Sequence, residues 1–126
     1  MNPLAIQLTL HGAIVLLFGM LSGIPQGVAI ASKQSEDFVR AWRVAHSGLT
    51  AGGTTMIAVS AVLSHLNLES IAASVLVCAF VISGYGFSLS LPYAAWVGHR
   101  GISPGGSAKN QFVYVGNMIG AIGSLI

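Results

Sequence analysis

The chain has 126 residues, of which 54% are hydrophobic and only 6% are charged. Because soluble domains carry about 25% charged residues, this composition excludes an ordinary soluble protein and predicts an integral membrane protein with a single domain, residues 1–126. The net charge of +2 comes from five basic and three acidic residues, which is too small an excess to indicate a nucleic-acid partner. Cys78 is the only cysteine, so no intrachain disulfide is possible.

Four apolar segments separated by short polar stretches define the expected architecture. The segment 1–32 contains no Asp, Glu, Lys or Arg, and neither does 44–68. About 20 apolar residues are enough to cross a bilayer. We therefore predict an all-α bundle of four transmembrane helices surrounded by lipid, at about residues 4–31, 37–65, 68–98 and 109–126.

Three residues are typical of helix starts. Pro3 suits the first turn of the first helix. Ser35 is expected to cap the second helix, because two acidic residues follow it in the first turn. Asn67 is expected to cap the third helix, with Glu69 in its first turn.

Glycines recur at spacings that favour close helix contact. Gly19, Gly23 and Gly27 recur every four residues in the first segment, and Gly48 and Gly52 form a similar pair in the second. The last segment carries Gly116, Gly120 and Gly123. These small-residue surfaces exceed what one small bundle needs, so we expect a homo-oligomer.

Ionisable residues inside the apolar segments are the functional candidates. All three carboxylates lie at segment ends, which argues against a transporter or proton relay built on buried acids. The remaining candidates are His11 and His46. They enter the membrane from opposite surfaces and differ in depth by more than about 10 Å, so they cannot share one metal ion within a chain.

His46 has the more informative surroundings. On a helix it shares a face with Arg43, Thr50 and Gly53, and neutral imidazole is a common iron ligand. A flat haem could lie on the bare surface at Gly53, with Arg43 close to its propionates. The structural alternative is that His46 hydrogen-bonds a neighbouring helix and Gly53 allows close packing.

The other histidines receive different assignments. We expect His11 to form a hydrogen bond across helices near the opposite surface, without binding iron. His99 returns to the membrane side where His46 lies, and it could be a second ligand or a hydrogen-bond donor. The loops that carry Lys33, Arg40, Arg43, Arg100 and Lys109 are expected in the cytoplasm by the positive-inside rule.

Several short motifs resemble the styrene oxide isomerases, small bacterial membrane enzymes with four transmembrane helices and a haem b. The matching pieces are His11-Gly12, then Trp42 with the run 45–48 and the run 56–59, and after the third helix Arg100-Gly101 and the run 110–112. They keep a common order and similar spacing over most of the chain.

The resemblance implies an enzyme of the bacterial inner (cytoplasmic) membrane. It implies a homotrimer with ferric haem b between subunits, bound by the histidine that matches His46. Because propionates favour the membrane edge, we expect Arg43 and Arg100 to pair with them there. In that family the iron acts as a Lewis acid toward the oxygen of a small hydrophobic epoxide. The ring opens to a benzylic cation, hydride shifts, and an aldehyde results. An apolar cavity keeps water away from the cation.

Two positions depart from the family pattern. The family places an important Asn six residues after the ligand histidine, where this chain has Gly52, and an important Tyr where it has Leu91. Tyr93, two positions on, is the candidate replacement for a catalytic role. Six residues turn a helix by about 600°, or about 120° from His46. If both positions matter, they come from different subunits.

Three functions remain open on the residues alone. The first is a haem-dependent epoxide isomerase. The second is a haem protein for electron transfer, gas sensing or haem handling. The third is a haem-free membrane scaffold or small-molecule channel, in which His46 serves only in packing.

Overall fold

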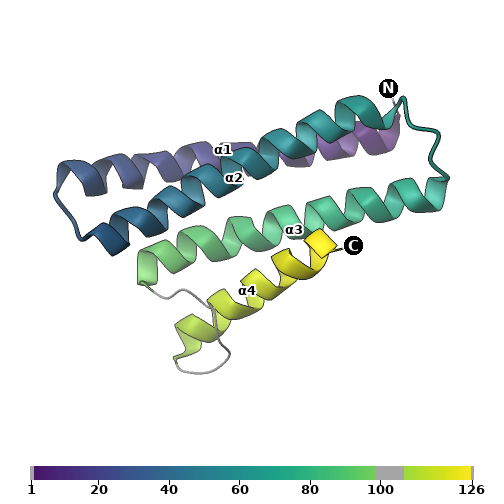
Figure 1. Ribbon diagram of the computed structural model, residues 1–126. Helices are drawn as coiled ribbons and strands as arrows, with labels where there is room; N and C mark the ends of the chain where they lie inside the picture. The colour runs from purple at the N-terminus through teal and green to yellow at the C-terminus, as the bar shows by residue number, and fades with distance from the viewer. Residues whose placement is uncertain (1, 99–106, 126) are drawn as a thin grey trace.

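The computed structural model describes residues 2–98 and 107–125, and in these ranges it contains four α-helices and no strand. Each helix runs antiparallel to the helix before it in the sequence (Figure 1). The predicted all-α architecture with four helices is thereby confirmed. The helices are α1 (Pro3–Ala31), α2 (Glu36–Leu63), α3 (Ser70–Val97) and α4 (Ala108–Leu125).

The first two helix starts follow the predicted signals, and the third does not. α1 begins at Pro3, and the Ser35 side chain accepts a 3.3 Å hydrogen bond from the Phe38 amide at the start of α2. The prediction for Asn67 is wrong. α2 already ends at Leu63 and α3 begins only at Ser70, so Asn67 lies in the connection, too far upstream to reach the first amides of α3.

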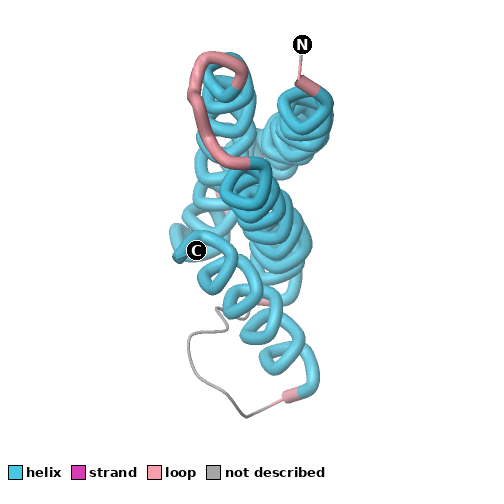
Figure 2. The backbone as a smooth tube through the Cα atoms, turned by 90° about the vertical axis from the view of Figure 1, so that its right-hand side faces the viewer, coloured by secondary structure: helices cyan, strands magenta, loops and turns pink. Residues whose placement is uncertain are grey.

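The helices form two tight pairs joined through α3. α1 packs along α2, and α4 packs within the described ranges on α3 alone. Figures 1 and 2 both show α3 lying between the α1–α2 pair and α4. Buried side chains such as Leu8, Leu49 and Met56 fill the space between α1, α2 and α3. A separate core of glycines brings α3 and α4 together, where a Cβ on Gly86 would lie 2.6 Å from the Gly120 nitrogen.

Two of the helices, α1 and α3, are long and apolar enough to cross a membrane. Large apolar side chains cover their outer surfaces, including Ile24, which is 63% exposed, and Ile71, which is 76% exposed. An outer surface of this kind is suited to lipid rather than to water. The first and last residues of α1, α2 and α3, and the first residue of α4, lie within two residues of the predicted bounds.

Hydrogen bonds between side chains of different helices cross this apolar framework within the described ranges. The His11 Nδ1 atom lies 2.7 Å from the Tyr85 hydroxyl oxygen, and their rings meet edge to face. Thr9 and Ser60 hydroxyls are also 2.7 Å apart, and the Ser90 hydroxyl donates to Asn117 at 2.7 Å. The expectation that His11 bonds across helices is therefore confirmed, with α3 as its partner helix.

Candidate functional site

His46 lies in the third turn of α2 and turns its ring toward α1. Its Nδ1 atom is 2.7 Å from the carbonyl oxygen of Gly19. Because a carbonyl oxygen can only accept, Nδ1 carries a proton, so the tautomer with this bond has its lone pair on Nε2. Nε2 has no hydrogen-bond partner among the residues that the structure describes. The side chain is thus held as a potential ligand for a metal.

Gly23 provides the surface on which the His46 ring rests. A Cβ atom at Gly23 would lie 3.0 Å from both Cε1 and Nδ1 of the imidazole. The close approach predicted from the glycine spacing is confirmed at Gly19 and Gly23. It is wrong for Gly27, where no heavy atom lies within 4 Å of an added Cβ. α1 and α2 are therefore in close contact at His46, and they separate toward Gly27.

The deeper part of the His46 face is covered by α1. Gly53 is buried, and its added Cβ would lie 2.5 Å from the Leu16 nitrogen. The Thr50 hydroxyl donates to the His46 carbonyl at 2.5 Å and also lies against Gly19. The expectation of a bare surface at Gly53 is wrong, because the small side chains let α1 pack directly on it. The structure thus contains both contacts of the structural alternative, the hydrogen bond from His46 to a neighbouring helix and the close helix packing at Gly53.

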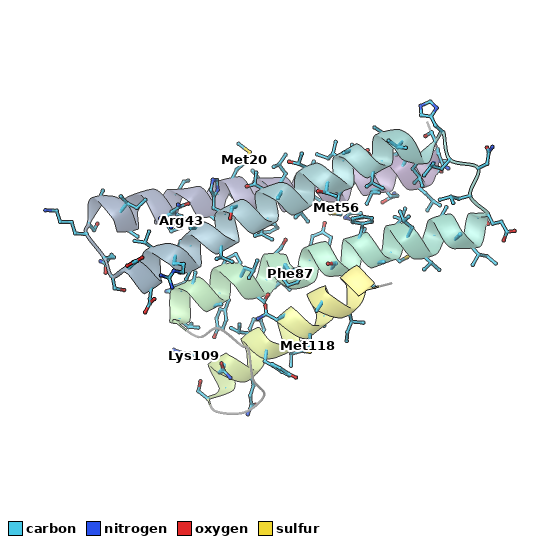
Figure 3. The ribbon with its side chains drawn as sticks, viewed as in Figure 1. Met20, Arg43, Met56, Phe87, Lys109 and Met118 are labelled. Atoms are coloured by element: carbon cyan, nitrogen blue, oxygen red, sulfur yellow. The ribbon has the colours of Figure 1, made fainter. Side chains whose placement is uncertain are left out.

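Arg43 lies one turn from His46 toward the connection between α1 and α2. Figure 3 places it near that end of the bundle, with Met20 on the neighbouring stretch of α1. Both side chains are exposed, and Met20 has 59% of its surface accessible. Arg43 thus offers an exposed cation one helical turn from His46, and such a guanidinium can pair with a carboxylate.

Trp42 adds a polar atom without a partner to this region. Its Nε1 atom is buried and has no hydrogen-bond acceptor in the described part of the chain. Buried indole donors are normally paired. Trp42 precedes His46 by one helical turn, so two nitrogen atoms near this end of α2 lack partners from the chain itself.

The protein side chains alone do not form a cage for a metal ion. Within residues 2–98 and 107–125, no group of three or more His, Cys, Asp and Glu side chains could hold one. A single histidine is sufficient for haem, because the macrocycle brings the other four nitrogen ligands and the protein supplies the axial one. The donor set around His46 thus fits a haem better than a bare ion.

The family profile described as styrene oxide isomerase matches residues 4–126. The chain belongs to the styrene oxide isomerase family. No curated protein and no solved structure matches the chain. Membership, together with two helices apolar enough to cross a bilayer, makes this family member a membrane protein with an isomerase-type function.

The positions at which this styrene oxide isomerase relative departs from the family lie away from the His46 ring, with Gly52 on another side of α2 and Leu91 on α3. Gly52 is exposed, and nothing lies within 4 Å of an added Cβ there. Leu91 approaches Gly48, whose added Cβ would be 3.7 Å from Leu91 Cδ1. Tyr93 packs its ring on Phe112 of α4 at 4.8 Å. No described contact joins any of them to His46 within one chain.

A cavity of about 570 Å³ opens between the first turns of α2 and the last turns of α3. Its inner wall is apolar and includes Leu91, and its mouth carries Arg40, whose guanidinium is 3.3 Å from Glu36. Val44 lines this cavity, and His46, two residues on, projects from another side of α2 toward α1. Arg100 and His99 lie outside the described residues.

Sequence reasoning about this styrene oxide isomerase relative missed the partners of both histidines. The acceptor for His46 is the backbone carbonyl of Gly19, which no side-chain motif marks. The partner of His11 is Tyr85 of α3, 74 residues away in sequence, and no motif links the two positions. The repeat of glycines on α1 was the signal that could have identified the partner of His46, because a helix face lined by glycines leaves its backbone carbonyls accessible to a neighbouring helix.

Proposed function

We propose that this chain is a haem b-dependent membrane isomerase that opens a small hydrophobic epoxide to an aldehyde or ketone. The observation that carries the proposal is the state of His46, with Nδ1–H donated to Gly19 and Nε2 left as a lone pair. This arrangement, in which the far ring nitrogen bonds to a backbone carbonyl, is typical of histidines that bind metals. Family membership supplies the reaction class.

The chain's own residues fit the haem as follows. His46 would hold the iron through Nε2, and Arg43 would pair with a propionate at the polar edge, together with Arg100. Thr50 and Gly53 pack on α1 and would thereby hold the His46 side chain in position to bind the iron. When bound, ferric haem supplies a Lewis acid that polarises the epoxide oxygen. The apolar surroundings would keep water from competing with the hydride shift.

The quaternary structure that we propose is a homotrimer with haem at the subunit interface. α2 does not reach the hydropathy that α1 and α3 show, and its outer surface carries exposed small residues. A surface of this type suits another helix better than lipid. It contains Ser47, Gly48, Ala51, Gly52, Thr54, Thr55 and Ala58. The number three comes from the family.

Substitutions on this outer surface of α2 test the oligomer. Ala51→Leu and Ala58→Leu should convert the trimer to smaller species, because larger side chains prevent close helix contact although lipid would tolerate them. Ala13→Leu, at an exposed alanine of α1, is the matched control and should keep the trimer. Native mass spectrometry in mild detergent measures the distribution. A wild-type protein that is only monomeric would contradict the proposal.

We also propose that all four helices cross the bacterial inner membrane. α2 and α4 would reach across with support from neighbouring subunits, and the loops with the basic residues would face the cytoplasm. Substituted-cysteine labelling in a Cys78→Ser background would report the side of each loop. Labelling of position 34 from the outside would overturn this orientation.

Incubation with epoxides tests the reaction itself. Haem-loaded protein should convert aryl epoxides such as styrene oxide to aldehydes, detected by gas chromatography, and the His46→Ala protein should not. Conversion that is equal in the two proteins would contradict a role for His46. Haem-loaded protein that converts no epoxide would favour the second candidate, a haem protein for electron transfer or sensing.

One observation supports that second candidate. The two positions that depart from the family, Gly52 and Leu91, lack the polar groups that the family uses there. The coordination number of the iron separates the functions. A five-coordinate haem leaves a position for substrate, whereas a six-coordinate haem, with His99 or another side chain as second ligand, indicates electron transfer.

A further inference from the structure

We propose that Gly19 and Gly23 of α1 are positioning residues that set the orientation and hydrogen-bonding state of the His46 imidazole, and through it the properties of the bound iron. This inference rests on the proposed function, because it concerns the same ligand. It goes beyond that function because it assigns the orientation and tautomer of the His46 imidazole to contacts with the backbone of α1.

Two contacts fix the ring. The 2.7 Å hydrogen bond from Nδ1–H to the Gly19 carbonyl determines which ring edge faces α1 and which tautomer is present. The contact with Gly23 fixes the plane of the ring, since a Cβ there would come within 3.0 Å of Cε1 and Nδ1. With both contacts in place, the ring has one orientation, in which Nε2 lies on the side of the imidazole opposite the bond to the Gly19 carbonyl.

The α1 backbone is itself held at the required distance. A Cβ on Gly19 would lie 2.5 Å from the Thr50 nitrogen, and one on Gly53 would lie 2.5 Å from the Leu16 nitrogen. These backbone contacts, at Thr50 and Gly53 one and two turns beyond His46 on α2, leave little freedom for the helices to separate there. The length of the His46–Gly19 bond is thus set by helix packing rather than by flexible side chains.

The identity of the acceptor affects the iron. A hydrogen bond to Nδ1–H raises the basicity of the ligating nitrogen. A neutral carbonyl does so less than a carboxylate would, and no carboxylate contacts His46 among the described residues. A ligand of moderate basicity leaves more positive charge on ferric iron, which suits a Lewis acid.

Chemical replacement of the side chain tests the hydrogen bond without altering α1. In the His46→Gly protein, haem binding should be restored by added 4-methylimidazole, which reproduces the histidine side chain and keeps its N–H. The isomer 1-methylimidazole has the same size but no N–H, and in the presence of equimolar hemin it should restore haem binding to the His46→Gly protein with about 2- to 10-fold weaker affinity. Equal affinities of the two isomers, measured by titration of the Soret band, would overturn the hydrogen bond to Gly19.

A pair of glycine substitutions tests the contact with the ring. Gly23→Ala should shift the iron–histidine stretching band in the resonance Raman spectrum of the ferrous protein, and it should lower haem retention by about 10-fold or more. Gly27→Ala, the same change one turn further along α1 in open space, should leave both at their wild-type values. A Gly23→Ala spectrum identical to that of wild type would overturn the positioning role.

The two proposals can fail separately. If wild-type protein binds no haem, or if the His46→Gly protein retains haem without added imidazole, the proposed function fails. If haem binding depends on His46 but the two methylimidazoles bind equally, only the role of Gly19 fails. Because the imidazole comparison needs no substitution in α1, it decides this point even if the Gly23→Ala protein does not fold.

Discussion

Replacing His46 with alanine should lower haem retention of the purified protein by more than about 100-fold. Loss of a hydrogen bond that supports a metal ligand lowers metal affinity by about 10- to 100-fold, and loss of the ligand itself should have a larger effect. The other described histidines lie far along the helices: His11 precedes Gly19 by eight residues on α1, and His65 follows His46 by 19 residues, beyond the end of α2. The measurement is the ratio of Soret absorbance to protein concentration after reconstitution with hemin and removal of excess.

His11→Ala is the matched control for this loss. His11 is also a half-buried histidine within an apolar helix, but its Nδ1 bonds to Tyr85 on α3. Its replacement should reduce stability, since it leaves the Tyr85 hydroxyl without this partner, while the Soret band remains. A folded His46→Ala protein with full haem content and an unchanged spectrum would contradict the ligand assignment.

Replacing Gly53 with alanine should destabilise the α1–α2 pair by about 1–3 kcal/mol or more, because the added methyl group meets backbone that cannot rotate away. Its Cβ would lie 2.5 Å from the Leu16 nitrogen and 2.7 Å from the Gly12 carbonyl oxygen. The consequence should reach His46, since separating the helices lengthens its bond to Gly19. Thermal unfolding followed by circular dichroism, in a detergent that holds single chains, measures the change.

The adjacent glycine offers the control for that measurement. Gly52→Ala adds the same methyl group to the same helix, in a position where nothing lies within 4 Å. Its unfolding temperature should match that of wild type or exceed it, because alanine favours helix by up to about 1 kcal/mol over glycine. Equal destabilisation by the two substitutions would show that Gly53 does not face α1.

The starts of α1 and α2 could be predicted from the sequence, but the start of α3 could not. Pro3 and Ser35 act through chemistry within one turn, so their roles follow from the residues themselves. Asn67 carries the same kind of signal, but α3 begins three residues later at Ser70. A capping residue is informative only where the helix start is known, and apolar pattern fixes helix ends to within a few residues.

For the candidate site, the helix face on which the residues lie was predictable, but what covers that face was not. Periodicity correctly places His46, Thr50 and Gly53 on one face of a helix, yet it cannot tell whether that face is open or covered by another helix. The structure shows it covered by α1. The acceptor for His46 is the backbone of Gly19, 27 residues away in sequence, and only the packing of α1 on α2 brings the two together.

The visible absorption spectrum of the wild-type protein, titrated with ferric hemin in mild detergent, tests the central claim most directly. If His46 presents Nε2 to a haem iron, a Soret band distinct from that of free hemin should grow and saturate at equimolar haem, and ferric signals in electron paramagnetic resonance should indicate one histidine ligand. Titration with no saturable Soret band, in protein shown to be folded by circular dichroism, would contradict a haem-dependent function for this chain.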